Sequence, residues 1–144
     1  MYLKKEKCLI VGVSKSGFSV CCFLLERGAK CFVYDDAETD EVKSAERDLS
    51  ERGATVVYKS EINELLGEIT MVVLSPGVAI DHDIPVRARK LGKRIIGELE
   101  LASEFCISPI VAVTGTNGKT TTCSMIDDIL KSGGVKSVLC GNVG

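Results

Sequence analysis

The sequence predicts an α/β protein built on an open, mostly parallel sheet. Short apolar runs rich in β-branched residues alternate with longer amphipathic stretches, which is the order of strands and helices in right-handed crossover units. Four polar stretches end at a glycine that is closely followed by such an apolar run. A glycine at this place can take the left-handed conformation that closes a helix. These glycines are Gly28, Gly53, Gly92 and Gly134.

Seven strands are expected, because seven segments are short and largely apolar, as strands buried on both faces of a parallel sheet are. They span residues 8–13, 31–34, 55–58, 71–74, 94–96, 110–113 and 137–140. Amphipathic segments between these strands are expected to be helices. They span residues 17–27, 38–52, 84–91, 98–105 and 119–131.

A domain boundary is expected after residue 97. Residues 1–97 hold five of the expected strands, nearly a complete α/β unit, and predict a Rossmann-like domain. Residues 98–144 hold the last two expected strands around one loop and one long helix, which is too little to close a core of their own. This second piece either packs against the first or begins a larger α/β domain of the phosphate-loop type.

The composition argues against a nucleic-acid binder. The net charge is -2 at pH 7, and the lysines and arginines form no basic stripe that could displace counterions from phosphates. The seven cysteines lack CxxC spacing and lie mostly among apolar residues. This pattern favours buried free thiols in a reducing cytoplasm over a reactive thiol. No apolar run resembles a signal peptide or a membrane span.

A glycine loop follows the first expected strand, in the segment LIVGVSKSGFSV. Gly12 and Gly17 match the outer positions of the GxGxxG dinucleotide fingerprint, but Ser14 replaces the middle glycine. A helix N-terminus at this place can still bind an anion, and Lys15 and Ser16 add a cation and a hydroxyl. Nucleotide binding and a purely structural turn both remain open on this loop alone.

Two further segments follow expected strands at their carboxyl ends, where ligands bind in open α/β sheets. Asp35 follows the second strand, near the usual place of a ribose- or base-contacting carboxylate, although solvated acids at a strand end explain it as well. The turn Ser75-Pro76-Gly77 follows the fourth strand and is equally compatible with an ordinary turn. His82, the one histidine, lies between two aspartates and is expected in an exposed polar loop without a catalytic role.

The segment VAVTGTNGKTTT carries the strongest functional signal. From Gly115 onward it predicts a nest of backbone N–H groups for phosphate, between an apolar strand and an amphipathic helix. Lys119 is expected to reach the β- and γ-phosphates of a nucleotide, and the Thr120 hydroxyl to bind Mg²⁺. The general pattern GxxxxGK[ST] fails at Val113, where it requires a glycine.

This loop resembles that of the Mur ligases, an ATP-dependent family that builds the peptide of peptidoglycan and whose loop lacks the first glycine. The segments GVSKSG, SPGVAIDHDIP, IIGELELASEF and GNVG resemble the D-glutamate-adding branch of that family. The resemblance covers the whole chain. It implies a cytoplasmic ligase that uses ATP and Mg²⁺ to phosphorylate the carboxylate of UDP-N-acetylmuramoyl-L-alanine. The amine of D-glutamate would then attack the acyl phosphate to give an amide.

The resemblance also implies roles for individual residues. Lys119 would be catalytic by stabilising charge on the γ-phosphate, and Thr120 would be the metal ligand. The phosphates would be lined by Gly115, Thr116, Asn117, Gly118, Lys119, Thr120 and Thr121. The UDP end of the substrate would be bound by Lys15, Ser16, Asp35, Asp36, Ser75, Gly77 and Asn142. The sequence departs from the family pattern around the uridine at Ser14, Lys15 and Ala37.

Members of this family have about three domains. The resemblance therefore implies that the chain is a fragment of a longer, monomeric protein and binds UDP without full catalysis. Two other functions stay open. One is a nucleotide-binding regulatory module without ligase activity. The other is an NAD-dependent oxidoreductase, which Ser14 disfavours because a serine obstructs backbone approach to a pyrophosphate. Neither nucleic acid nor a membrane is expected as a partner.

Overall fold

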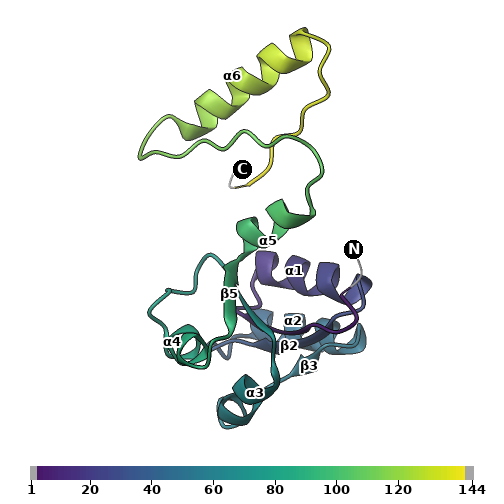
Figure 1. Ribbon diagram of the computed structural model, residues 1–144, viewed down its shortest axis with the longest axis vertical. Coiled ribbons are helices and arrows are strands. Elements are labelled where there is room, and N and C mark those ends of the chain that lie inside the picture. Colours follow the sequence, from purple (N-terminus) through teal and green to yellow (C-terminus); the bar gives the residue numbers. More distant parts are fainter. Residues whose placement is uncertain (1–2, 142–144) are drawn as a thin grey trace. The chain divides into compact units, whose positions relative to one another are not determined.

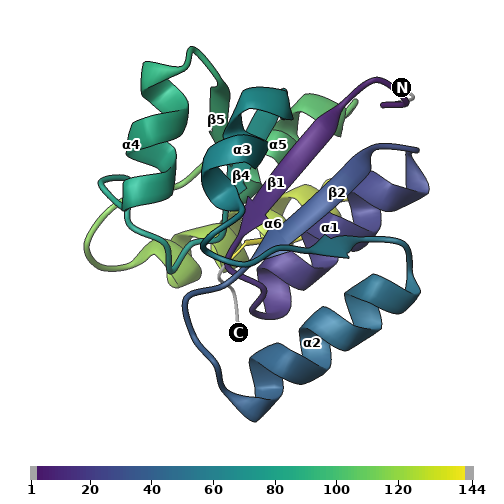
Figure 2. The same cartoon turned by 90° about the horizontal axis from the view of Figure 1, so that it is seen from below.

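The computed structural model of the protein describes residues 3–141. The chain forms two compact units, Met1–Phe105 (unit 1) and Cys106–Gly144 (unit 2). Unit 1 contains a sheet with helices on both of its faces (Figures 1 and 2). The described part of unit 2 contains a single helix between two irregular segments.

Five parallel strands form the sheet of unit 1, which confirms the expected open α/β fold. The strand order is β3-β2-β1-β4-β5, so β1 lies at the centre. Cys8 of β1 pairs with Cys31 of β2 on one side and with Met71 of β4 on the other. The strands are β1 (Lys7–Val11), β2 (Lys30–Tyr34), β3 (Thr55–Val56), β4 (Met71–Leu74) and β5 (Arg94–Gly97).

Three helices cover one face of the sheet: α1 (Lys15–Glu26), α2 (Asp40–Glu51) and α5 (Glu98–Phe105). Each buries a stripe of apolar side chains at helical spacing. Val20 and Leu24 of α1, Leu49 of α2 and Leu101 of α5 join one hydrophobic core with the strands. This packing places α5 in unit 1, eight residues beyond the boundary expected from the sequence (105 against 97).

The opposite face carries α3 (Ile62–Glu68) and α4 (Asp83–Lys90). Ile62, Leu65 and Leu66 of α3 and Ile84 of α4 form a second core with the other side of the strands. The sequence prediction missed α3. The helix is short, and its signal was the apolar spacing i, i+3, i+4 of Ile62, Leu65 and Leu66.

The expected helix-closing glycines are confirmed, because all four have positive φ: Gly28, Gly53, Gly92 and Gly134. Three of the seven cysteines are buried, two are half-buried and two are exposed, and all are free thiols. Burial raises the pKa of the Cys8 thiol to about 12, which keeps that thiol protonated and unreactive at neutral pH. Across residues 3–141, no helix has the length and apolar character needed to cross a membrane.

Unit 2 contains α6 (Lys119–Ser132), as expected, but the strands expected at residues 110–113 and 137–140 do not form in the described chain. That prediction was wrong. A parallel strand needs a neighbouring strand for its backbone hydrogen bonds, and an apolar sequence alone does not supply one. Both segments instead line one groove along α6, together with its side chains Cys123, Ile126, Asp127 and Leu130.

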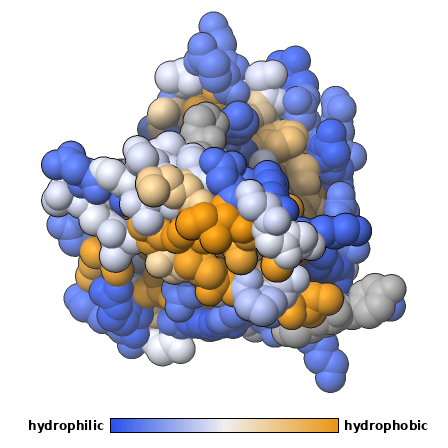
Figure 3. Space-filling view, turned by 90° about the horizontal axis from the view of Figure 1, so that it is seen from above, coloured by the Kyte–Doolittle hydropathy of each residue, from blue (hydrophilic) through white to orange (hydrophobic). Residues whose placement is uncertain are grey.

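Asp127 joins α6 to the second of these segments. Its carboxylate is buried and accepts hydrogen bonds from Lys131 Nζ, at 2.7 Å, and from Ser137 Oγ, at 2.5 Å. Large apolar side chains of unit 2 nevertheless stay exposed, including Val111, Met125 and Ile129. Figure 3, which views the molecule from above Figure 1, shows several groups of hydrophobic residues, the largest near the centre of the view.

Candidate functional site

The sheet of unit 1 has a topological switch point at the carboxyl ends of β1 and β4. These strands are neighbours, yet the chain leaves β1 toward β2 and leaves β4 toward β5, on opposite sides. In open α/β sheets, the loops that follow two such strands diverge, and ligands bind in the crevice between them. The residues of unit 1 that are expected to bind the UDP end of a substrate follow β1, β2 and β4.

Close packing of Gly12, Gly17 and Ser75 brings the start of α1 against this edge. Ser75 Oγ donates a hydrogen bond to Gly12 O at 2.7 Å, and Ser75 is buried. A Cβ on Gly17 would lie inside contact distance of the Gly12 carbonyl and 2.5 Å from Ser75 Oγ. Gly17 is thus required by backbone packing, whereas Gly12 has a φ of +90° and a Cβ there would lie 2.9 Å from Ser75 Cβ, so Ser75 has a structural role at the site.

The N-terminus of α1 lies at this switch point. Ser14 is its N-cap residue but, among the described residues, makes no capping hydrogen bond with its side chain. The first turn holds no acidic residue, and Lys15, exposed, is its first residue, followed by half-buried Ser16. Unpaired N–H groups and the helix dipole favour an anion at such an end. Lys15 and Ser16 are placed where they could contact that anion.

Asp35 follows β2 and fixes the neighbouring loops. Its Oδ2 accepts a hydrogen bond from Val13 N at 2.8 Å, which links the loop after β2 to the loop after β1. Its Oδ1 accepts a hydrogen bond from Ala37 N at 2.9 Å. Asp35 is partly buried. Both carboxylate oxygens therefore already have backbone partners, and Asp35 shapes the glycine loop as well as lying beside it.

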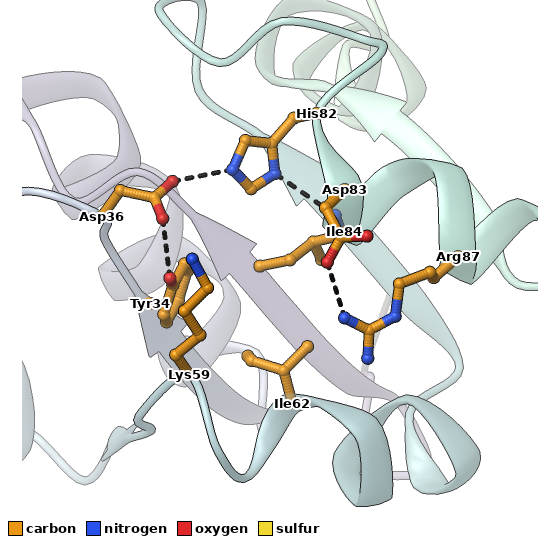
Figure 4. A pocket seen from close by; sticks show the side chains of 8 residues that line it. All are labelled: Tyr34, Asp36, Lys59, Ile62, His82, Asp83, Ile84 and Arg87. Carbon is orange, nitrogen blue, oxygen red and sulfur yellow. Dashed lines mark hydrogen bonds and ion pairs between the residues drawn. The ribbon is translucent and has the colours of Figure 1, made fainter.

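Asp36 lies in a small pocket beside the crevice (Figure 4). Its Oδ1 accepts from the Tyr34 hydroxyl at 2.7 Å, and its Oδ2 lies 2.7 Å from His82 Nε2. The hydrogen bond from Tyr34, followed by that from His82, lowers the pKa of the Asp36 carboxyl below its usual value. Burial and the adjacent Asp36 raise the pKa of Tyr34 to about 12. At neutral pH, Asp36 is therefore ionised and Tyr34 is protonated.

The sequence prediction missed the other polar residues of this pocket. Lys59, which precedes α3, and Arg87 of α4 face it together with Asp83, whose Oδ2 binds Arg87 Nη1 at 2.6 Å. The space between the side chains is about 30 Å³, enough for a water molecule. These residues lie on different elements, and nothing in the local sequence around Lys59 or Arg87 links them to Asp36.

The turn after β4 completes the crevice. Val78 N donates to Ser75 O at 2.9 Å, which closes the turn around Pro76 and Gly77. Gly77 is exposed at its tip, and a Cβ added there would meet no atom within 4 Å. Unit 1 thus brings Lys15, Ser16, Asp35, Asp36, Ser75 and Gly77 to one sheet edge. Asn142 lies outside the described residues.

The second glycine loop precedes α6 in unit 2. Gly115 and Gly118 have positive φ, and Gly118 is the N-cap residue of α6. Lys119 Nζ folds back onto the loop and donates to Gly115 O at 2.5 Å and to Thr116 O at 3.3 Å. Residues 114–122 are exposed. The ammonium group thus lies over the loop that was expected to hold phosphate.

The donor set of this loop fits Mg²⁺ held together with a nucleotide. Thr120 offers one exposed hydroxyl in the first turn of α6. Over residues 3–141, no group of three or more His, Cys, Asp or Glu side chains could hold a metal ion. Mg²⁺ commonly takes few protein ligands and completes its shell with phosphate oxygens and water, so one hydroxyl is compatible with such a site.

Known proteins resemble the chain along its whole length. It is 39% identical over 146 residues to the UDP-N-acetylmuramoylalanine--D-glutamate ligase of Caldicellulosiruptor saccharolyticus, with all of this chain and 32% of the relative covered. The chain therefore spans about a third of the curated relatives it matches.

Solved structures show the same fold. The UDP-N-acetylmuramate-alanine ligase MurC of Thermotoga maritima matches 88% of this chain and 29% of its own, with 28% identity and a TM-score of 0.57. A pseudomurein peptide ligase type C from Methanothermus fervidus matches 90% of this chain and 27% of its own, with 21% identity and a TM-score of 0.55. At that identity the second likeness shows the fold alone.

A family model described as "Mur ligase MurD-like, N-terminal domain" matches residues 6–97. These residues include all five strands of the sheet and the glycine loop at its switch point. The chain therefore belongs to the Mur ligase family, amide-forming ligases of peptidoglycan synthesis, and carries the family's MurD-like N-terminal domain.

Proposed function

We propose that the chain belongs to a cytoplasmic, ATP-dependent ligase that joins D-glutamate to UDP-N-acetylmuramoyl-L-alanine, and that unit 1 binds the UDP end of that substrate. The names of the curated relatives support this reaction. Because the chain spans about a third of those relatives, we propose substrate binding for the chain and the complete reaction for a longer protein.

The observation that carries the proposal is the uncapped N-terminus of α1 at the switch point. It joins unpaired N–H groups, the positive end of a helix dipole and Lys15 at one place. A diphosphate is the matching ligand, because it carries two negative charges and many acceptor oxygens. Gly12 and Gly17 let the start of α1 pack closely against Ser75, which holds this N-terminus at the switch point.

The uridine would lie beside the diphosphate, toward the loop after β2. Asp36 is ionised there and exposed, and carboxylate oxygens accept hydrogen bonds from the N–H and hydroxyl groups of a nucleoside. Gly77, at the tip of the turn after β4, leaves room on the other side. Ser75 contributes by holding the turn against Gly12.

The loop of unit 2 supports a role in binding ATP. Lys119 already lies over the loop, and residues 115–121 provide glycines, hydroxyls and exposed N–H groups for phosphate oxygens. Mg²⁺, held by Thr120, would supply charge neutralisation between the phosphates. Attack by the substrate carboxylate on the γ-phosphorus releases ADP and forms an acyl phosphate, and attack by the amine of D-glutamate then releases phosphate. Lys119 would stabilise the negative charge on the transferred group.

A titration with UDP, followed by amide NMR, tests the proposal for unit 1. We expect saturable shifts of the amides of residues 12–17, 35–37 and 75–77, because these three loops line the crevice. Titration with inorganic phosphate is the control, since it separates binding of any anion at α1 from recognition of the uridine. Absence of shifts at residues 12–17 and 75–77 would reject the proposed UDP site.

A further inference from the structure

His82 contacts two elements at once. Its Nδ1 accepts a hydrogen bond from Ile84 N at 3.3 Å, which caps the start of α4, and its Nε2 lies 2.7 Å from Asp36 Oδ2. Figure 4 shows the imidazole between the helix and the Asp36 carboxylate, pointing at both. The histidine thus connects α4 with the loop after β2.

This connection crosses the sheet edge at the candidate site. Asp36 follows β2, whereas His82 lies between β4 and α4, and β1 runs between β2 and β4. The link therefore spans the carboxyl end of β1, where the glycine loop begins. It joins the loop that carries Asp35 and Asp36 to the segment that continues from the turn at Gly77.

The contacts of His82 define its tautomer. Because Nδ1 accepts from a backbone N–H, it carries a lone pair, so the proton of the neutral ring is on Nε2. Nε2–H then donates to Asp36, whose other oxygen accepts from the Tyr34 hydroxyl. The Asp36 carboxylate is held from two sides and has a defined orientation.

We propose that His82 is a positioning residue for the uridine end of the site: it orients the Asp36 carboxylate and fixes the spacing of the two loops that would enclose a uridine nucleotide. This inference rests on the proposed UDP-binding function. Preorganised groups bind a ligand more tightly, because less freedom is lost when the ligand arrives.

The surroundings of His82 and Asp36 indicate that their contact orients the carboxylate more than it stabilises the fold. The His82 side chain is 26% exposed and that of Asp36 is 52% exposed, so water competes with their hydrogen bond and reduces its contribution to folding. Charged groups of other elements also face the pocket: Lys59 before α3, and Asp83 with its partner Arg87 on α4. Only with the Asp36 carboxylate included do these cations and carboxylates balance.

Two substitutions test the roles of the two ring nitrogens separately. In H82N, the amide oxygen can still cap α4 in place of Nδ1, because asparagine is a good N-cap residue, but the side chain is too short to reach Asp36. In H82Q, the longer side chain can donate to Asp36 in place of Nε2. The proposal predicts about tenfold weaker UDP binding for H82N and affinity closer to that of the unchanged chain for H82Q.

The test measures the UDP dissociation constant of the 144-residue chain, together with the thermal midpoint of each variant. A double-mutant cycle with D36A shows whether His82 acts through Asp36. If it does, H82N added to D36A weakens binding no further. An effect on the thermal midpoint alone, with unchanged UDP affinity in H82N, would overturn the inference.

The single histidine also provides a spectroscopic test. At about pH 8.5, where an ordinary imidazole is neutral, ¹⁵N chemical shifts of the ring should show the Nε2–H tautomer and should move on UDP addition. The Nδ1–H tautomer would contradict the inference. If the unchanged chain does not bind UDP at all, the proposed function fails and the inference fails with it. If the chain binds UDP and H82N binds it equally well, the inference alone fails.

Discussion

Gly17 lies where α1 meets the carboxyl ends of β1 and β4, and its hydrogen side chain allows that contact. In G17A, the new Cβ would overlap the Gly12 carbonyl and lie 2.5 Å from Ser75 Oγ. Because backbone cannot move aside easily, we expect a loss of about 3 kcal/mol in the free energy of unfolding, measured by urea denaturation.

The matched control for this substitution is G77A. Gly77 has an ordinary φ, and an added Cβ would meet nothing within 4 Å. We expect its stability to stay within about 0.5 kcal/mol of that of the unchanged chain. Equal stability of G17A and G77A would show that the close approach of α1 to the sheet edge is not as described.

The hydrogen bond from Tyr34 to Asp36 predicts how stability depends on pH. It lowers the pKa of Asp36 in the folded state, so it contributes stability above about pH 4, which is lost as the pH falls and the carboxyl is protonated. The pKa of Tyr34 is raised to about 12 in the folded chain, so its own contribution is lost as the pH rises between about 10 and 12.

The variant Y34F removes this hydrogen bond and leaves the ring in place. We expect it to lower the free energy of unfolding by about 1 kcal/mol near neutral pH. The difference from the unchanged chain should shrink as the pH falls through the titration of Asp36, which urea denaturation at several pH values measures. A difference that is constant from neutral to acid pH would rule out the described pairing.

Sequence reasoning predicted the place at the sheet edge of residues whose neighbours along the chain carry a recognisable signal. Lys15 and Ser16 lie in a recognisable glycine loop, and Asp35 directly follows an apolar strand. The sequence predicts an exposed loop around His82. It does not reveal the contact of His82 with Asp36, because the two residues are 46 positions apart. Such a contact depends on the crossover of the chain between strands, which residue types and spacing do not encode locally.

Among the elements, α6 and the loop before it make the clearest prediction for nucleotide binding. In K119A, the loop loses the ammonium group that lies over Gly115 and Thr116. We expect shifts induced by Mg²⁺–ATP at the amides of residues 115–121 to be lost or to need at least about tenfold more nucleotide. Amide NMR measures this directly.

The matched control is K136A, which removes an exposed lysine beyond the opposite end of α6. A helix of this length separates the two lysines by about 20 Å, so only K119A should affect the loop. If K136A weakened the response equally, the effect would be one of net charge and not of the loop.

The elements of unit 1 were largely predictable. Strands β1, β2, β4 and β5 are short apolar runs bounded by turn residues, and positive φ at Gly28 and Gly92 closes helices as expected. Residues 110–113 have the same composition as a buried strand but do not form one, because strand formation requires a paired neighbour. Composition predicts which segments are suited to a strand, and pairing decides which become one.

At the scale of the whole molecule, the two hydrophobic cores and the side chains packed against them lie within residues 3–105. We therefore expect residues 1–105 alone to unfold cooperatively in urea, with nearly the same midpoint as the full chain. Residues 106–144 alone should show no cooperative transition, because their large apolar side chains are exposed. A shortened chain of residues 1–105 without a cooperative transition would contradict this division.

The central proposal is that the switch point of unit 1 binds a uridine diphosphate group. The most direct measurement is calorimetric titration of the chain with UDP and, separately, with NAD⁺, since the fold is shared with dinucleotide-binding proteins. We expect one UDP per chain, bound at least about tenfold more tightly than NAD⁺, because Ser14 replaces the glycine of the dinucleotide fingerprint. NAD⁺ binding as tight as that of UDP, or no binding of UDP, would contradict the proposed site.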